Sequence, residues 1–486
     1  MSTTKVDYEM VVGLEVHCQL GTKTKLFCGC GTDGFGAVAN TRVCPVCTGQ
    51  PGVLPVLNKR AVELAFQAAL ALDCQLAPVS IFARKNYFYP DLPKAYQISQ
   101  YEQPFSQHGK LAIRLKDGER VVRIHRIHME EDAGKLVHEI GSEVLDHSLV
   151  DFNRGGVPLI EIVSEPDIRG SEEAYAYLTA LKEVLIHAGV SRCDMEKGEM
   201  RCDANVSLRP RGQEKFGTRA EIKNLNSFKG VKEALEYEFR RQAEILDGGG
   251  RVVQETRLWD AHRMATFSMR SKEEAHDYRY FPDPDLVPLV ADKAWIETLK
   301  AGLPELPAAK RARFEKDFGL SAYDADVLAS DKDVSAFFEE AAKGLAADAV
   351  KPLANLVIND LLGKLNAEKQ SITQSPIKPA MIAELVGMVQ NGKISTKGAK
   401  ELFPKMWDTG KAPGVLVEEL GLSQVNDENL VRTWVAEALD RNPQAAADLR
   451  AGKDRAIGSI VGAVMKLSKG KANPALVNKL IKEAVK

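Results

Sequence analysis

Apolar and polar residues alternate with a period of two in three stretches of the first half of the chain. Residues 11–20 (VVGLEVHCQL) and 202–209 (CDANVSLR) follow the alternation closely, and residues 219–225 (RAEIKNL) follow it less regularly. Successive side chains of a β-strand point to opposite faces, so the pattern predicts strands with one buried and one polar face. We expect these strands to be neighbours in one antiparallel sheet.

Helical periodicity separates these strands. Residues 58–76 are rich in alanine and leucine, residues 171–189 begin at a serine suited to a helix N-cap, and residues 228–246 end in glycines. The strands are too irregularly spaced for a doubly wound parallel sheet. The first part of the chain is therefore predicted to be α+β, an antiparallel-sheet cradle with flanking helices.

Prolines mark a boundary after this region. They recur through residues 281–289 and 302–310, and beyond them strand patterns give way to helical segments joined by short polar turns. A second hinge is predicted at residues 411–422. These boundaries divide the chain into a cradle domain (1–293), an all-helical domain (294–410) and a small helical tail domain (411–486).

The chain of 486 residues is too long for one hydrophobic core. Its formal net charge of −2 says nothing about partners, because opposite local charges cancel in the total. Residues 450–486 break that balance, with nine lysines and arginines against two acidic residues. The N-terminus lacks a secretory pattern, and no apolar run approaches the ~18 residues of a membrane span. We therefore expect a cytoplasmic protein, in which disulfides are rare.

Four of the eight cysteines form two close pairs, Cys28-x-Cys30 and Cys44-x-x-Cys47, each at a turn rich in glycine or proline. Two such pairs can wrap four thiolates tetrahedrally around zinc, and a site with four protein ligands is closed and structural. The alternative is four unrelated reduced thiols. The remaining cysteines lie in apolar patterns and are expected to be buried thiols: Cys18, Cys74, Cys193 and Cys202.

Acidic residues recur on the polar faces of the predicted strands. Glu15 stands beside His17, Asp203 and Glu221 belong to two further strands, and residues 124–135 (IHRIHMEEDAGK) contain three consecutive carboxylates. If these strands are neighbours, their polar faces form one surface suited to Mg²⁺, which prefers oxygen ligands and usually shares its coordination shell with phosphate. Basic residues that would serve those phosphates are Arg84, Lys85, Lys94, Lys135 and Lys223.

For each of these residues alone a structural explanation stays open. A strand-face glutamate is usually solvated, and a lone histidine is more often packed than bound to metal. The aromatic loop at residues 87–96 could stack on a base or only pack. The chain has no G-x-x-x-x-G-K-[ST] motif, so any ATP is not held by a P-loop. Patterning alone therefore leaves a metal–nucleotide site and a solvated acidic face both open.

A dense series of long motifs spans residues 13–228: GLEVHCQL, CPVCTGQPGVLPVLN, RKNYFYPDLPKAYQISQ, HMEEDAGK, NRGGVPLIEIVSEPD, RCDANVSLRP and EIKNLNSF. DYRYFPDPDL continues the series at residues 277–286, and GKANPALVNKLIKEAVK follows at residues 470–486. These motifs resemble those of the B subunit of the aspartyl/glutamyl-tRNA(Asn/Gln) amidotransferase, and NRGGVPLIEIVSEPD is the most specific of them. The resemblance covers essentially the whole chain.

The resemblance implies an ATP-dependent ligase. In this family, ATP phosphorylates the side-chain carboxylate of a mischarged Glu-tRNA(Gln) or Asp-tRNA(Asn), and ammonia then displaces phosphate to give Gln-tRNA or Asn-tRNA. Such phosphoryl transfer depends on positioning and charge neutralisation, which carboxylates holding Mg²⁺ and nearby lysines would supply. The sequence leaves open which of the two tRNAs is the substrate.

The resemblance also implies roles for single residues. Glu15 and His17 match the metal motif of the family, and Glu131 matches its HMEED acid as a catalytic group and Mg²⁺ ligand. The two carboxylates beside Glu131 are expected to bond to the backbone or to face water. Asp203 and Glu221 match catalytic positions that bind metal or line the path of ammonia. Binding of ATP is assigned to three lysines: Lys85, which matches a phosphate-contacting position, Lys94 and Lys223.

Partners are implied as well. The chain shows no glycine- and serine-rich amidase signature, so ammonia is expected from a separate glutaminase, the A subunit, with a small C subunit bridging them in a heterotrimer. A sheltered channel would keep water from the acyl phosphate. The basic tail at residues 411–486 suits the tRNA backbone, and a solvated pair of basic helices is the alternative. Zinc is not a constant of the family, but this chain keeps all four cysteines.

Two other classes of function compete with this enzyme. A tRNA-binding or scaffolding subunit with an inert acidic face would tolerate Glu131→Gln, whereas the enzyme would lose phosphorylation. A zinc hydrolase is disfavoured, because four thiolate ligands leave no open position for water.

Overall fold

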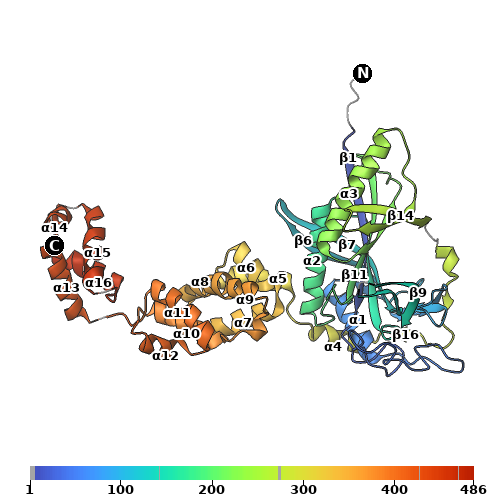
Figure 1. Ribbon diagram of the computed structural model, residues 1–486, viewed down its shortest axis with the longest axis horizontal. Helices are drawn as coiled ribbons and strands as arrows, with labels where there is room; N and C mark the ends of the chain where they lie inside the picture. The colour runs from blue at the N-terminus through green and yellow to red at the C-terminus, as the bar shows by residue number, and fades with distance from the viewer. Residues whose placement is uncertain are drawn as a thin grey trace, which may run out of the picture. The chain divides into compact units, whose positions relative to one another are not determined.

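The computed structural model describes residues 6–141, 143–271, 275–425, 427–451, 453–468 and 470–485. The chain divides into two compact units, Met1–Leu306 and Pro307–Lys486 (Figure 1). The first unit combines a large sheet with helices, and the described residues of the second are almost entirely helices and turns. The predicted α+β class is therefore confirmed. No described helix is both long and apolar enough to cross a membrane.

A nine-stranded sheet forms the centre of the first unit. In order across the sheet, its strands are β14 (Ala265–Ser271), β13 (Glu255–Asp260), β12 (Ala220–Leu225), β11 (Met200–Pro210), β1 (Tyr8–Gln19), β10 (Pro158–Ser164), β7 (Gly118–Glu131), β6 (Ser106–Leu115) and β2 (Gln75–Leu76). All neighbours are antiparallel except β12 and β13, which are parallel. The alternation in β1 is as predicted, because Leu14, Val16 and Cys18 are fully buried on one face.

Helices cover the apolar face of this sheet. The first-unit helices are α1 (Lys59–Ala71), α2 (Ser171–His187), α3 (Phe228–Asp247) and α4 (Lys293–Ala301). Leu181 of α2 and Leu235 of α3 share one buried core with Leu14 and Val16 of β1, and α2 and α3 lie side by side (Figure 1). Burial of these side chains removes apolar surface from water and fixes the helices on this face. The opposite face of the central strands keeps its polar side chains for the candidate site.

Two helix boundaries differ from the sequence prediction. α1 ends at Ala71 because Asp73 adopts φ +54°, and the chain then enters β2 instead of continuing as a helix. Ser171 is the first residue of α2 and not its cap, which is Gly170; the Ser171 hydroxyl donates to Glu236 Oε1 at 3.1 Å. The predicted end of α3 at a glycine is confirmed.

Short strands carry two of the recognised motifs towards the polar face. β4 (Ala83–Asn86), β5 (Tyr96–Ser99) and β15 (Phe281–Pro282) form a three-stranded sheet, and β5 contacts β7. Arg84 fixes the two segments to each other, with Nε 2.9 Å from Asp283 Oδ2 and Nη2 2.8 Å from Asp285 Oδ2. Further short elements of the unit are β3 (Val79–Ser80), β8 (Lys135–Ile140), β9 (Glu143–Asp151), η1 (Ala275–Tyr278) and β16 (Leu289–Val290).

The second unit holds two separate hydrophobic cores. The first is built from α5 (Pro307–Phe318), α6 (Ala322–Ser330), α7 (Lys332–Ala342), α8 (Ala347–Asn355), η2 (Leu356–Leu361), α9 (Leu362–Glu368), η3 (Ile372–Gln374), α10 (Pro379–Gln390), α11 (Thr396–Thr409) and α12 (Pro413–Glu419). The other is built from α13 (Glu428–Arg441), α14 (Pro443–Arg450), α15 (Ile457–Leu467) and α16 (Pro474–Val485), with η4 (Asp454–Ala456) between α14 and α15. α12 lies inside the segment predicted as a hinge, and its Leu416 and Val417 are buried in the first of these cores.

Candidate active site and metal centre

Three strands bring the carboxylates of Glu15, Asp203 and Glu221 together. Glu15 of β1 lies directly opposite Asp203 of β11, and Asn205 of β11 lies opposite Glu221 of β12. Residues opposite each other in antiparallel strands share a face, as do residues two apart in one strand. One oxygen from each of the three carboxylates lies within 4.8 Å of the others. We call these three residues the first acidic group.

Hydrogen-bond donors surround the first acidic group. Lys223 Nζ lies 2.7 Å from Asp203 Oδ2 and 3.3 Å from Glu221 Oε1, and Asn205 Nδ2 donates to Glu15 Oε1 at 2.9 Å. Burial alone lowers the pKa of Lys223, but Asp203 and Glu221 outweigh it and raise that pKa above its ordinary value. The group tolerates converging carboxylates because a cation already lies among them.

A second acidic group, His17, Glu130 and Glu161, lies on the same face of the sheet. His17 is opposite Glu161 of β10, with His17 Nε2 3.3 Å from Glu161 Oε2. His128 of β7 is opposite Glu161 in turn, and its Nε2 lies 3.3 Å from Glu130 Oε1. One ligand atom from each member of the group lies within 4.8 Å of the other two. The two groups are adjacent, because Glu15 and His17 are two residues apart in β1.

Lys85 of β4 gives the second acidic group its positive neighbour. Burial alone lowers the pKa of Lys85, but the carboxylates of Glu130 and Glu161 outweigh it and raise that pKa. Burial likewise raises the pKa of Glu130, yet the Lys85 charge and the hydrogen bond from His128 lower it to about 2. The pKa of Glu161 is also lowered, against its burial, by His128 and His17. Both carboxylates are therefore ionised at neutral pH, as metal binding requires.

Aromatic rings stand beside the Lys85 ammonium. Its Nζ lies 5.0 Å from the centre of the Tyr278 ring and 6.0 Å from that of Tyr87. Tyr101 and Tyr280 stack with ring centres 4.2 Å apart. The DYRYFPDPDL and RKNYFYP motifs thus meet at this point. A flat aromatic surface next to a cation suits a nucleobase with its phosphates.

The three consecutive carboxylates of residues 130–132 point to different partners, and all three are buried. Glu130 joins the second acidic group. The Glu131 carboxylate pairs with the Lys94 ammonium and accepts from the Ile98 backbone N–H at 3.0 Å. Asp132 accepts from Arg201 Nη2 at 2.9 Å and from Gln19 Nε2 at 2.7 Å. The expectation that the neighbours of Glu131 bond to the backbone or face water holds for Asp132, which also accepts from the Ala133 backbone N–H at 3.0 Å, and is wrong for Glu130. The structure brings Glu131 into neither acidic group.

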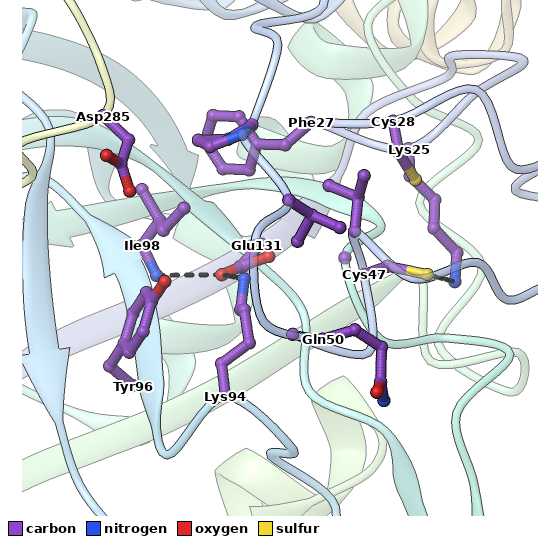
Figure 2. A pocket seen from close by; sticks show the side chains of 15 residues that line it. Lys25, Phe27, Cys28, Cys47, Gln50, Lys94, Tyr96, Ile98, Glu131 and Asp285 are labelled. Carbon is purple, nitrogen blue, oxygen red and sulfur yellow. Dashed lines mark hydrogen bonds and ion pairs between the residues drawn. The ribbon is translucent and has the colours of Figure 1, made fainter.

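Strand geometry explains the position of Glu131. Successive residues of β7 point to opposite faces, so Glu130 shares the polar face with His128 and Glu131 does not. Figure 2 shows the cavity of about 100 Å³ that Glu131 lines. Lys94 and Tyr96 stand near Glu131, and Lys25, Cys28 and Cys47 form another part of the lining.

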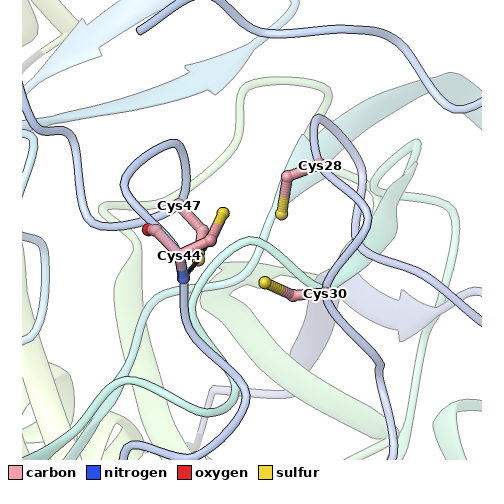
Figure 3. A group of neighbouring side chains, drawn as sticks. All are labelled: Cys28, Cys30, Cys44 and Cys47. Carbon is pink, nitrogen blue, oxygen red and sulfur yellow. Dashed lines mark hydrogen bonds between the residues drawn. The ribbon is translucent and has the colours of Figure 1, made fainter.

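The four paired cysteines converge in the loop that follows β1 (Figure 3). Their Sγ atoms all lie within 4.8 Å of one another, and Cys44 and Cys47 Sγ are 3.9 Å apart. Thiolates bound to one Zn²⁺ at about 2.3 Å stand roughly 3.8 Å from each other, so the cluster needs only small movements to close on the ion. Hydrogen bonding from Cys28 lowers the pKa of Cys47 to about 4, with Lys25 adding to the effect. The Cys28, Cys30, Cys44 and Cys47 cluster can hold a metal such as zinc.

Sequence reasoning missed Glu130 and Glu161 as members of the site. Both are buried carboxylates on central strands. A signal was present for Glu161, because it is the only charged residue in the apolar strand PLIEIVS at residues 158–164. A buried charge is costly unless it is compensated, and its presence in such a strand indicates a specific role.

Two family models match the chain, and the first of them describes a catalytic domain. Residues 10–297 match the family described as the GatB/GatE catalytic domain, and residues 336–485 match the GatB domain. The first match contains the sheet, both acidic groups and the cysteine cluster.

Curated relatives match the chain almost end to end. The B subunit of the aspartyl/glutamyl-tRNA(Asn/Gln) amidotransferase from Persephonella marina is 54% identical over 481 residues, which cover 99% of this chain and 100% of the relative. The protein of the same name from Carboxydothermus hydrogenoformans is 54% identical over 477 residues, 98% of each chain. The one from Brevibacillus brevis is 53% identical over 479 residues, 98% of this chain and 99% of the relative. The chain belongs to this family of amidotransferase B subunits.

Proposed function

We propose that this chain carries the phosphorylation and amidation site of a tRNA-dependent amidotransferase acting on Glu-tRNA(Gln), Asp-tRNA(Asn) or both. The side-chain carboxylate of the tRNA-bound amino acid attacks the γ-phosphorus of ATP, and ADP leaves. Ammonia then attacks the acyl carbon, the bond to phosphate breaks, and the nitrogen loses a proton to leave the amide. The activity in the names of the relatives supports this class of reaction.

The donor sets of both acidic groups fit Mg²⁺. The first offers three carboxylates, and the second offers two carboxylates and an imidazole, with the ligand atoms of each group within 4.8 Å of one another. Mg²⁺ favours sites that offer few protein ligands and leave room for water and phosphate oxygens. When bound, Mg²⁺ would neutralise charge on the triphosphate. The role of Glu131 as a Mg²⁺ ligand stays a prediction. In the structure its carboxylate pairs with Lys94, outside both acidic groups.

In this proposal, lysines and tyrosines beside the two acidic groups position the nucleotide. Lys85 lies beside the second acidic group, and Lys223 lies beside the first. Each ammonium would therefore hold phosphate oxygens next to a metal position. The rings of Tyr278 and Tyr280 would stack on the base. Binding of ATP by Lys94 stays a prediction. In the structure its ammonium pairs with Glu131.

The remaining parts of the proposal concern partners and zinc. The relatives are named as subunits, which supports an assembly in which a glutaminase A subunit supplies ammonia and a small C subunit bridges the two. The basic tail would bind the tRNA backbone, through α15, α16 and the residues between them. We propose that zinc in the cysteine cluster is structural and that the protein acts in the cytoplasm.

The observation that carries this proposal is the convergence of Glu15, Asp203 and Glu221 from three strands. Its test is co-expression with the A and C subunits, followed by assay of ATP-dependent amidation of both mischarged tRNAs. Asp203→Asn removes one oxygen charge at nearly constant shape and should abolish phosphorylation of the aminoacyl group. Asp247→Asn, at the exposed end of α3, is the matched control and should retain it. Full amidation by folded Asp203→Asn protein would indicate an inert acidic face on a scaffolding subunit.

A further inference from the structure

Lys25 is a completely buried lysine at the edge of the cysteine cluster. Its side chain has 0% exposure. Its ammonium donates to Cys47 Sγ at 3.6 Å and to the Phe152 carbonyl at 3.4 Å, and the contact with Cys47 is drawn in Figure 2. Within the part of the chain that the structure describes, no carboxylate forms an ion pair with Lys25.

A buried ammonium needs a negative partner, because removing its charge from water is costly unless an opposite charge compensates it. The Phe152 carbonyl offers only a dipole, so the negative partner of Lys25 is on the side of the Cys47 sulfur. Four thiolates around one Zn²⁺ carry a net negative charge, which is spread over the sulfurs. With a metal bound, the anion beside Lys25 would therefore be the cysteine cluster as a whole, which Lys25 contacts through Cys47.

We propose that Lys25 is the charge partner of the Cys28, Cys30, Cys44 and Cys47 metal centre, donating to the Cys47 sulfur and offsetting part of the negative charge of the centre. This role rests on the zinc site of the proposed function. A charge-assisted hydrogen bond to a bound thiolate makes the loss of that thiolate from the metal less favourable. Lys25 is thus a positioning residue that raises metal retention without being a ligand.

The same lysine connects the metal centre to the wall of the Glu131 cavity. A Cβ placed on Gly156 would lie 3.4 Å from both Lys25 Cδ and Cys47 Cβ, and 3.9 Å from Glu131 Oε2. The Gly156 carbonyl also accepts from the Leu26 backbone N–H at 2.9 Å. Lys25, Cys47 and Glu131 therefore pack around one glycine. Loss of the metal would leave the ammonium with Cys47 and the Phe152 carbonyl alone at this packed position.

The test compares three variants of the full-length protein. Lys25→Met keeps the length of the side chain and removes charge and donor, and Lys25→Gln keeps a donor without the charge. Lys23→Met, an exposed lysine two residues away, is the matched control. Zinc per chain is measured by atomic emission, and zinc release to a chromogenic chelator is followed over time. Removing an outer partner of a metal ligand typically weakens metal binding about 10–100-fold, so release should accelerate by that factor in Lys25→Met.

Cobalt substitution supplies an optical measurement that a general loss of stability would not change. The donor on Cys47 lowers the energy of its sulfur electrons, so the thiolate-to-cobalt charge-transfer band should move to lower energy in Lys25→Met and stay in place in Lys23→Met. Identical release rates and bands in Lys25→Met and wild type overturn the role of Lys25 alone. Wild-type protein that holds no zinc overturns the metal centre as well. If Lys25→Met does not fold, faster release from Lys25→Gln than from Lys23→Met supports the proposal, and equal release overturns it.

Discussion

The cysteine cluster and the two acidic groups of the first unit are built in opposite ways. All four cysteines come from residues 28–47, which form loops and turns with no long strand or helix. The acidic groups draw Glu15, Glu130, Glu161, Asp203 and Glu221 from five different strands of one sheet. The sheet fixes the acids through backbone hydrogen bonds and a buried core, whereas a long loop without such pairing depends on the ion to hold its sulfurs together.

We therefore expect the cysteine loop to need its metal for stability and the acidic face to need its metal for chemistry. The acidic face is already compensated by Lys85 and Lys223, so its strands do not need a metal to keep their places. The cysteine loop has Lys25 as a buried cation beside Cys47, and its four sulfurs carry their full negative charge only when they are bound to a metal. Losing one acid should therefore remove activity and spare the fold. Losing one cysteine should weaken the fold and spare the acidic face.

The largest effect is expected for Glu161→Gln in the second acidic group. The substitution removes a charge that His17 and His128 face, while the β10 backbone pairs stay in place. Amidation should fall by about 10³-fold, roughly 4 kcal/mol of transition-state stabilisation, as when a preorganised charge-stabilising group is lost. Initial rates with saturating ATP and mischarged tRNA measure this, and zinc content should remain that of wild type.

Glu165→Gln serves as the control for this prediction. Glu165 follows the same strand and bonds the exposed His125 at 2.9 Å, outside the acidic groups. Its rate should match wild type. Loss of zinc or a lowered melting temperature in Glu161→Gln would show that the acidic face also supports the fold, which would break the comparison.

Removal of one thiolate should act on stability instead. Cys44→Ser leaves three sulfurs and is expected to lose the ion, which removes roughly 2.7 kcal/mol if free zinc stands at about 100 times its Kd. Urea unfolding of the first unit, with and without added zinc, measures the loss. Cys74→Ser changes a buried thiol outside the cluster and should keep the full zinc content. Wild-type stability together with lost activity in Cys44→Ser would mean that the cysteines serve the chemistry.

The same contrast explains what the sequence could and could not predict. Close cysteine pairs and the alternation in β1 and β11 are local patterns, so the cysteine cluster and the polar strand faces were predictable from a few residues each. The choice between Glu130 and Glu131 was not, because one position of register in β7 decides which carboxylate meets Glu161. A β-bulge at Val163 and Ser164 shifts that register, and no local sequence pattern predicts the bulge.

The burial of Lys25 was equally difficult to predict from the sequence. Lys25 lies in a polar-looking stretch, GTKTKLF, and only the packing of the cysteine loop against residues 152–156 makes it inaccessible. The parallel pairing of β12 with β13 is also a tertiary result, because α3 lies between these strands in the chain and returns it to the same edge of the sheet. Periodicity identifies faces of elements, but contacts between distant elements decide which charged group on a face is buried.

The smallest effect is expected at Gly156, which lies between the cysteine cluster and Glu131. Its φ is +86°, a left-handed conformation that costs a residue with a Cβ roughly 1–2 kcal/mol, and the added Cβ would contact Lys25 and Cys47 at 3.4 Å. Gly156→Ala should lower the free energy of unfolding by about 1 kcal/mol, measured as a shift of the urea midpoint. Gly249→Ala is the matched control, because Gly249 has a similar φ of +74° but open space around it, so it should show the backbone cost with unchanged zinc release and amidation. Because Gly156 touches the cysteine side and the Glu131 side alike, faster zinc release and slower amidation should appear together in Gly156→Ala. A variant that changed only one of them would show that the cysteine cluster and Glu131 are independent even where both pack against Gly156.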